Sequence, residues 1–129
     1  QGSNAVIIVV ANPVDVLTRV ALERSGWDRG RVIGSGTVLD SSRLRYLISK
    51  YCGVGVHNVH AYILGEHGDS EVLSWTAARA GSVPIRDFAA QVGGPITDTV
   101  RAAIDGGSNA RDRPAVAQVT DRPAPPTTQ

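Results

Sequence analysis

The sequence predicts a protein of the α/β class, in which the end of a parallel sheet is followed by the start of a mixed α+β region. Residues 5–11 form a continuous apolar run rich in β-branched side chains, which is typical of a parallel strand buried on both faces. A helical apolar pattern follows, and then a short strand over 31–33, which completes a strand–helix–strand unit.

The first helix is expected to begin at Asn12, a good capping residue, with Pro13 at the first helical position and Asp15 in the first turn. Its apolar side chains recur at helical spacing at Val14, Leu17, Ala21 and Leu22. Gly26 is expected to end the helix.

A second helix is expected to begin at Asp40 as the capping residue and to end near Gly53. Its apolar stripe consists of Leu44, Leu47, Ile48 and Cys52, so Cys52 is read as a core residue. Residues 59–64 and 71–75 are strand-like. Apolar side chains at helical spacing predict a further helix over 95–105.

The composition of the chain limits the classes of partner that can be expected. The chain has 129 residues, enough for one modest domain, and a net charge of +1. No Lys/Arg cluster is present, so neither nucleic acid nor a membrane surface is an expected partner. Residues 106–129 are rich in proline, arginine and small polar residues without a helical stripe, and we predict that they are disordered.

His67 is the leading candidate for chemistry. It follows a strand-like segment and lies in a turn between Gly65 and Gly68, with acidic residues on either side. A histidine with its ordinary pKa near 6.5 can give or take a proton at neutral pH. A lone histidine in such a turn is more often a polar loop tip, so the functional reading depends on partners elsewhere in the chain.

Asp40, Arg43 and Arg45 are the candidate partners. In a helix Asp40 and Arg43 share a face, whereas Arg45 points elsewhere. One reading is structural: Asp40 caps the helix and pairs with Arg43. The other is functional: Asp40 accepts the second N–H of the histidine, and Arg43 binds a substrate carboxylate with its planar guanidinium. Taken alone, this helix favours the structural reading.

Asn12 and the possible metal ligands also have two readings. Asn12 is a helix cap, but it also lies at the carboxyl end of a strand, where open α/β sheets bind ligands. His57 and His60 are three apart in a strand-like segment and should project to opposite faces. No CxxC or HExxH spacing is present, so no metal site is predicted.

The 34–36 Gly-Ser-Gly segment lacks the third glycine of a dinucleotide loop, because Leu39 takes its place.

Three segments together resemble the bacterial L-lactate dehydrogenases. Residues 12–18 (Asn-Pro-Val-Asp-Val-Leu-Thr) resemble the family's strand-end asparagine segment, 31–45 its domain junction, and 59–70 its catalytic histidine segment. The similarity runs from about residue 4 to about residue 105. It implies the end of a Rossmann-type parallel sheet over 1–38, the start of an α+β catalytic domain over 39–105, and an aberrant tail over 106–129.

The resemblance also implies roles. His67 would exchange a proton with the oxygen of pyruvate or lactate, Asp40 would orient it, and Arg43 would bind the substrate carboxylate. The implied substrate contacts are Asn12, Pro13, Val14, Asp15, Asp40, Ser41, Ser42 and Arg43, and the implied NAD contacts are Val10, Ala11, Asn12 and Ser35. Arg45 and His60 match positions that bind fructose 1,6-bisphosphate in allosteric members. A cytoplasmic homotetramer is implied for the whole enzyme.

Two alternatives remain at this stage. A malate dehydrogenase of the same superfamily is one, because the loop that selects pyruvate or oxaloacetate has no counterpart in this sequence. A truncated, non-catalytic product is the other. We expect the isolated chain to bind NADH weakly or not at all. We also hypothesise a frameshift near residues 106–111, because a one-base shift lets the codons of 124–129 read Gly-Ala-Thr-Asn-Tyr-Ala, close to the family's sequence.

Overall fold

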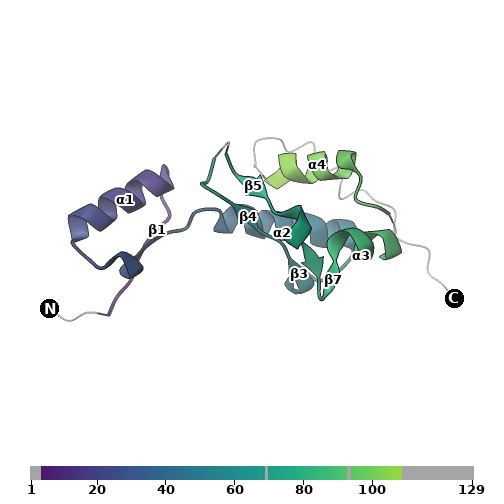
Figure 1. Ribbon diagram of the computed structural model, residues 1–129, viewed down its shortest axis with the longest axis horizontal. Coiled ribbons are helices and arrows are strands. Elements are labelled where there is room, and N and C mark those ends of the chain that lie inside the picture. The colour runs from purple at the N-terminus through teal and green to yellow at the C-terminus, as the bar shows by residue number, and fades with distance from the viewer. Residues whose placement is uncertain (1–3, 69, 93, 109–129) are drawn as a thin grey trace.

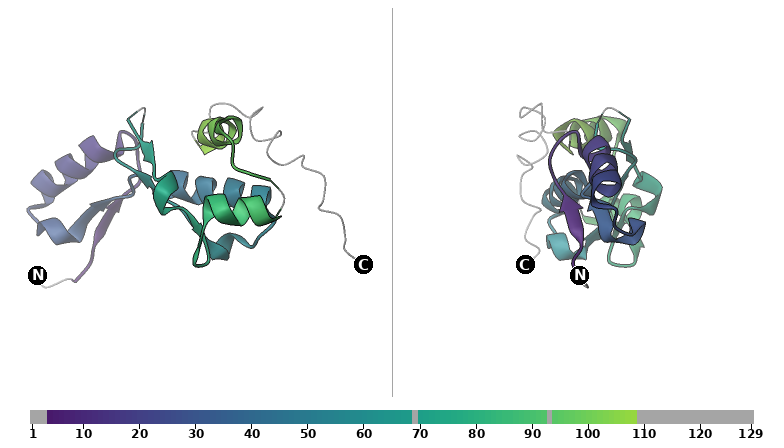
Figure 2. Two further views of the ribbon diagram at one scale, coloured as in Figure 1. Left: turned by 45° about the vertical axis from the view of Figure 1, so that its right-hand side comes forward. Right: turned by 90° about the vertical axis from the view of Figure 1, so that its left-hand side faces the viewer.

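The computed structural model describes residues 4–68, 70–92 and 94–108, which form two lobes (Figures 1 and 2). The first lobe consists of β1 (Ile7–Val9), α1 (Val14–Ser25), a 3₁₀ turn (Arg29–Arg31) and β2 (Val32–Gly34). The second lobe is built around α2 (Val38–Cys52). Residues 35–37 connect the lobes, so the elements that follow the junction belong to a separate packing unit.

The first lobe confirms the predicted strand–helix–strand unit. β1 and β2 are parallel, with Ile7 opposite Val32 and Val9 opposite Gly34. α1 contacts both strands. The backbone N–H of Ser35 donates to the carbonyl oxygen of Val9 at 2.8 Å, which continues the parallel ladder by one step. The carboxyl ends of the two strands therefore lie at the same edge of the sheet.

The expectation that the first strand is buried on both faces is wrong for this chain. Ile8 and Ile33 are direct neighbours in the parallel register, and they are 64% and 49% exposed. α1 packs against one face of the two-stranded sheet, so side chains that alternate onto the other face remain accessible to solvent. The regular strand is also shorter than the apolar run that predicted it.

Both predicted helix starts are shifted. Pro13 is the N-cap of α1 instead of Asn12, since the N–H of Leu17 makes the first helical bond to the Pro13 carbonyl at 3.0 Å. Asp40 is not the cap of α2, because α2 begins two residues earlier and Thr37 is its N-cap. The side chain of Asp40 is therefore not used at the helix end, and it is buried in the first turn.

The second lobe packs its core around α2. α4 (Asp98–Ser108) and α3 (Ile85–Val92) contact α2, as do two small antiparallel sheets. One sheet has the strand order β3 (Val59–His60), β6 (Arg79–Ala80) and β7 (Val83–Pro84), and the other pairs β4 (Ile63–Leu64) with β5 (Val72–Leu73). Ile48, Ile85 and Ile104 are fully buried at the centre of this core. The predicted stripe of α2 is buried as expected.

The predicted strand over 59–64 is two short strands that belong to different sheets, β3 and β4. Between them, the carbonyl of Ala61 accepts from Nε of Arg45 at 3.0 Å, whereas the carbonyl of Tyr62 accepts from the N–H of Ser74 at 3.0 Å and continues the β4–β5 pairing by one step. The strand predicted over 71–75 is confirmed only at Val72–Leu73, since Trp75 begins a 3₁₀ turn.

The last helix extends further than predicted. α4 covers Asp98–Ser108, so the first three residues of the segment predicted to be disordered are helical. The remainder of that segment, 109–129, lies outside the described residues. Residues 124–129, on which the frameshift hypothesis rests, belong to this remainder. α3 was missed, although Ile85, Phe88, Ala89 and Val92 follow helical spacing. Within the described residues, no helix has the length and apolar character needed to cross a bilayer.

Candidate functional site

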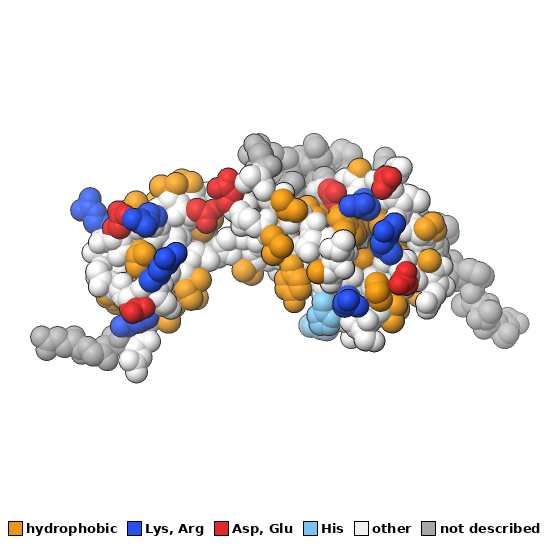
Figure 3. Space-filling view, viewed as in Figure 1, with side chains coloured by type: hydrophobic (Ala, Val, Ile, Leu, Met, Phe, Trp, Pro, Cys, Tyr) orange, Lys and Arg blue, Asp and Glu red, His pale blue; other side chains and the backbone are white. Residues whose placement is uncertain are grey.

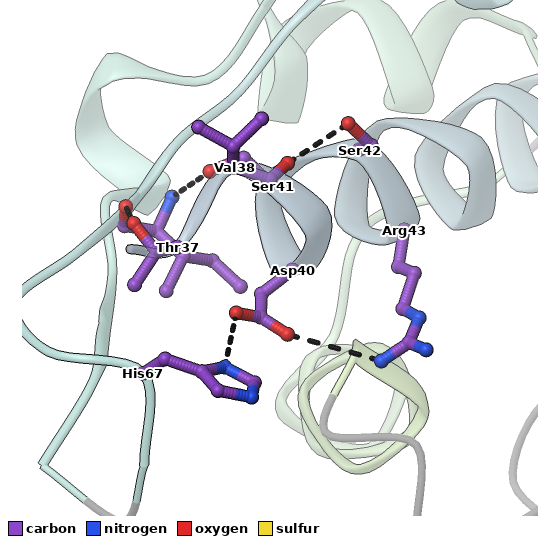
Figure 4. A network of polar contacts seen from close by, with 8 residues as sticks. Thr37, Val38, Asp40, Ser41, Ser42, Arg43 and His67 are labelled. Carbon is purple, nitrogen blue, oxygen red and sulfur yellow. Dashed lines mark hydrogen bonds and ion pairs between the residues drawn. The ribbon is translucent and has the colours of Figure 1, made fainter. Parts of the chain in front are cut away.

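His67 and Asp40 form the centre of the site (Figure 4). Nδ1 of His67 lies 2.7 Å from Oδ2 of Asp40, although the two residues are 27 positions apart. The Asp40 side chain is 1% exposed and the His67 side chain is 33% exposed. An ionised carboxylate can only accept, so the proton of this bond belongs to Nδ1. The arrangement fixes the imidazole and leaves Nε2 for a ligand.

The turn between β4 and β5 carries His67. The strands pair with Ile63 opposite Leu73 and Leu64 opposite Val72, which closes the turn a few residues from the histidine. Gly65 has a φ of +100°, in the region that favours glycine, and an added Cβ would lie 3.4 Å from the carbonyl oxygen of Ser70. The predicted role of a flanking glycine in shaping this turn is thus supported by its geometry.

Arg43 lies on the other side of the same carboxylate (Figure 4). Its Nη1 is 3.8 Å from Oδ1 of Asp40, and its side chain is 39% exposed. The predicted i,i+3 relationship with Asp40 is therefore present, but the contact is too long for a hydrogen bond. Most of the guanidinium's donors remain available for an anionic ligand beside His67.

The hydroxyls of α2 make protein contacts. Thr37 Oγ1 donates to the carbonyl oxygen of Ile63 at 2.6 Å, and Ser41 Oγ accepts from the N–H of Ile63 at 2.9 Å. Ser42 is exposed, and its hydroxyl donates to the carbonyl of Val38 at 2.9 Å. Ser41 is buried, so its hydroxyl is held inside the protein.

Glu71 was missed by sequence reasoning, and the structure places it beside the pair. Asp40, His67 and Glu71 each present a possible ligand atom, and the three atoms lie within 4.8 Å of one another. Two carboxylates and an imidazole could hold a divalent cation. The Asp40–His67 bond and the neighbouring guanidinium of Arg43 oppose this, because a cation would displace the first and be repelled by the second. This cluster was not predicted, since it depends on how the turn folds back onto α2.

The predicted NAD contacts gather at the carboxyl edge of the parallel strands. Val10, Ala11 and Asn12 directly follow β1, and Ser35 directly follows β2. The first three are exposed and Ser35 is half-buried. This is the edge at which open parallel sheets bind nucleotides. Four of the eight predicted substrate contacts, Asn12 to Asp15, lie in the first lobe, with only Val14 buried.

Asn12 is not joined to the Asp40–His67 pair by a hydrogen bond or ion pair among the described residues. Figure 1 and the left view of Figure 2 place the β4–β5 turn at the end of the second lobe that faces the first lobe. The predicted substrate contacts therefore come from two lobes. The structure brings Asp40 and Arg43 together with His67, whereas Ser41 binds Ile63 and Ser42 lines a hollow with Arg45 and His60.

Arg45 and His60 meet at a separate hollow of about 290 Å³. It is lined by Ser42, Arg45, Val56, His57, Val59 and His60. The guanidinium carbon of Arg45 lies 5.1 Å from the centre of the Tyr62 ring, so this side chain points away from Asp40, as predicted. Figure 3 shows histidine side chains at the surface over β3.

The prediction that His57 and His60 project to opposite faces is wrong, since both line this hollow. Val56–Asn58 form a 3₁₀ turn instead of a strand. His57 lies in that turn and His60 lies in β3, so the side-to-side alternation of a single strand does not relate the two residues. His57 therefore joins the two residues that the resemblance had assigned to an anionic activator.

Comparisons with known proteins show which proteins this chain resembles. The sequence profile of the lactate/malate dehydrogenase α/β C-terminal domain matches residues 37–103. The L-lactate dehydrogenase of Allorhizobium ampelinum is 53% identical over 104 residues, which make up 81% of this chain and 34% of that relative. The L-lactate dehydrogenase of Treponema denticola is 56% identical over 88 residues, or 68% of this chain and 28% of that relative.

Solved structures give the same result. A lactate dehydrogenase, MGS-M5, from a Medee basin deep-sea metagenome library matches with a TM-score of 0.75 and 47% identity, covering 84% of this chain and 34% of that one. The minor L-lactate dehydrogenase of Enterococcus mundtii matches with a TM-score of 0.73 and 31% identity, covering 92% and 41%. The chain spans about a third of the length of the curated relatives it matches.

Proposed function

The chain belongs to the lactate/malate dehydrogenase family, and we propose that it carries the proton-transfer and carboxylate-binding side chains of an NAD-dependent L-lactate dehydrogenase. The observation that carries the proposal is the 2.7 Å contact between Nδ1 of His67 and the buried carboxylate of Asp40. Burial of that carboxylate prevents water from competing for the imidazole, and the bond holds one tautomer.

In the proposed reaction, His67 donates a proton from Nε2 to the carbonyl oxygen of pyruvate and recovers it in the reverse direction. Asp40 stabilises the charged imidazole through Nδ1. Arg43, partly exposed on the same turn of α2, binds the pyruvate carboxylate through two parallel hydrogen bonds. These groups lie on one turn of α2 and one loop, so a substrate whose carboxylate is bonded directly to its carbonyl carbon, as in pyruvate, would contact both.

NAD is the proposed cofactor, and when bound it supplies or accepts the hydride. Val10, Ala11, Asn12 and Ser35 fit its nicotinamide end, because they lie together at the carboxyl edge of β1 and β2. Exposed apolar side chains there suit a planar ring, and the side-chain amide of Asn12 suits a polar group on the cofactor or substrate. Asn12, Pro13, Val14 and Asp15 are proposed to complete the substrate pocket with 40–43.

Several further properties are proposed from the family relationship alone. They are a cytoplasmic location, a homotetramer for the whole enzyme, and a domain boundary after residue 38, with the nucleotide-binding part before it. We also propose that the 129-residue chain by itself has no useful turnover. The exposed sheet face around Ile8 and Ile33 supports that proposal, because a parallel sheet covered on one face is unlike the doubly covered sheets of stable α/β domains.

A chimera tests the proposed reaction. The segment of the Allorhizobium ampelinum L-lactate dehydrogenase that aligns with this chain is replaced by the 104-residue match from this chain. We expect the chimera to oxidise NADH with pyruvate, and we expect His67→Asn to lower kcat by about 10²-fold or more, the usual contribution of a general acid. NADH binding by fluorescence confirms that each variant is folded.

The outcome also separates the alternatives. A chimera that binds NADH and reduces oxaloacetate in preference to pyruvate would favour malate dehydrogenase chemistry in this segment. Two results would favour a non-catalytic product: a folded chimera without turnover on either substrate, or a chimera whose kcat is unchanged in His67→Asn. The unmodified chain is assayed alongside, with no turnover expected.

We also propose that Arg45 and His60 bind fructose 1,6-bisphosphate as an activator. The support is that both line one hollow, on a different side of α2 from Arg43. In the chimera the sugar bisphosphate should lower the pyruvate KM, and a variant with Arg45→Gln and His60→Gln should lose that response. If the KM is the same with and without the compound, the activator proposal fails, while the catalytic proposal stands.

A further inference from the structure

Two hydroxyl groups of α2 bind both polar backbone groups of a single residue in β4. Thr37 Oγ1 donates to the carbonyl oxygen of Ile63 at 2.6 Å, and the N–H of Ile63 donates to Ser41 Oγ at 2.9 Å. Thr37 and Ser41 are four residues apart and therefore lie one above the other on the helix. We call this pair the hydroxyl clamp.

Both hydroxyls depart from the contacts that their positions favour. Thr37 is the N-cap of α2, yet it makes no side-chain cap bond to its own helix. Serines inside helices commonly donate to the carbonyl four residues earlier, as the next residue, Ser42, does with Val38. The Ser41 hydroxyl instead accepts from β4. Two departures directed at the same residue indicate a specific contact between α2 and β4.

The clamp covers the edge of β4 that β5 does not use. The carbonyl of Tyr62 accepts from the N–H of Ser74 on the β5 side. Backbone groups alternate along a strand, so the N–H and carbonyl of Ile63 point the other way, toward α2. The side chain of Ile63 is buried, and its backbone groups would lack partners without the two hydroxyls. The helix thus takes the place of a neighbouring strand.

The clamp lies between the two residues of the candidate site. Asp40 directly precedes Ser41, and His67 comes four residues after Ile63. We propose that Thr37 and Ser41 are positioning residues, which hold β4 on α2 and thereby set the contact between His67 Nδ1 and Asp40 Oδ2. Their relevance to catalysis rests on the proposed function, whereas their effect on the contact does not.

The test measures the Nδ1–H proton of His67 directly, by nuclear magnetic resonance of the full 129-residue chain labelled with ¹⁵N-histidine. A short bond to a carboxylate gives a downfield proton that exchanges slowly with water. His67→Asn assigns the signal. Thr37→Val and Ser41→Ala each remove one clamp hydroxyl, and we expect either change to speed the exchange of this proton by about tenfold or to broaden the signal beyond detection.

Matched variants separate positioning from general destabilisation. Ser49→Ala removes another buried serine hydroxyl from the same helix, and Thr18→Val removes the hydroxyl that donates to Val14 in α1. Both should leave the Nδ1–H signal unchanged. Thr37→Ser retains the hydroxyl, so its Nδ1–H signal should match that of the unmodified chain. Amide protection at Ile48, in the core of α2, should be the same in every clamp variant.

The proposal is overturned if the Nδ1–H signal survives in Thr37→Val and Ser41→Ala with its exchange rate unchanged. It is also overturned if Ser49→Ala weakens the signal as much, or if the unmodified chain shows no such signal. None of these results requires turnover, so an inactive chimera would count against the proposed reaction and not against the clamp.

Discussion

Arg43 and Arg45 are two residues apart on α2 and serve different surfaces. Arg43 lies 3.8 Å from Oδ1 of Asp40, whereas Nε of Arg45 donates to the carbonyl of Ala61 at 3.0 Å and its guanidinium lies over Tyr62. Helical geometry separates side chains two apart by roughly 200°. A single helix can therefore contribute one cation, Arg43, to the proposed substrate site and a second cation, Arg45, to a distinct anion site.

Replacing Arg43 by lysine tests whether its planar geometry matters. Lysine keeps the positive charge but cannot make two parallel hydrogen bonds to a carboxylate. In the chimera we expect Arg43→Lys to lower kcat/KM for pyruvate by about 10- to 10²-fold, the loss of one charge-assisted hydrogen bond. Arg19→Lys, on the exposed surface of α1, is the control. Equal kcat/KM values for wild type and Arg43→Lys would rule out bidentate binding.

Asp40→Asn tests the charge that supports His67. Asparagine has nearly the same shape and can still accept from Nδ1, but it lacks the negative charge that stabilises a protonated imidazole. We expect kcat in the chimera to fall by about 10²-fold or more while the fold is retained. Asp98→Asn, an exposed acid in the first turn of α4, provides a matched charge removal. Full activity in Asp40→Asn would show that burial of the carboxylate serves structure alone.

Gly65→Ala tests the turn that carries His67. Its φ of +100° disfavours any residue with a Cβ, and that Cβ would lie 3.4 Å from the Ser70 carbonyl. We expect a loss of about 1–3 kcal/mol in the free energy of unfolding, measured with urea. Gly68→Ala is the comparison, because a Cβ at Gly68 meets nothing within 4 Å. Equal losses at the two positions would mean that the turn is not constrained at Gly65.

The sequence predicted those features that depend on local spacing. The strand–helix–strand unit, the stripe of α2 and the shared face of Asp40 and Arg43 all follow from periods of two or 3.6 residues. The 27-residue separation of Asp40 and His67 follows no such period, and only the resemblance of whole segments connected them. The resemblance also assigned Arg45 and His60 to one activator site; both line one hollow, and the activator role stays a prediction.

The errors share a cause, which is that tertiary contacts override local preference. Aspartate is a common capping residue, but the Asp40 side chain turns inward to His67. Thr37 is the N-cap, but its side chain makes no cap bond because its hydroxyl donates to β4. The 59–64 segment divides between two sheets, and the distant Arg45 binds the carbonyl of Ala61 between them. The error on His57 was of another kind, because this residue lies in a 3₁₀ turn and the alternation of the following strand does not extend to it.

Asp105 in α4 is a partly buried acid whose carboxylate accepts from Nε1 of Trp75 at 3.2 Å. Burial raises the pKa of this carboxyl above its ordinary value of 3.8, and the hydrogen bond from Trp75 and the charge of Arg101 oppose the rise. The folded state thus holds the proton more tightly than the unfolded state. This group's contribution to stability consequently falls as pH rises from 3.8 through the folded pKa.

Asp105→Asn removes the buried charge and keeps an oxygen that can accept from Trp75. We expect the variant to be more stable than wild type near pH 7, and the difference to shrink to nothing as pH falls below 3.8, where the carboxyl is protonated in both states. Urea midpoints across this range measure it, with Asp87→Asn, an exposed acid in the first turn of α3, as the control. A destabilised Asp105→Asn near neutral pH would mean that the attraction of Arg101 outweighs the cost of burial.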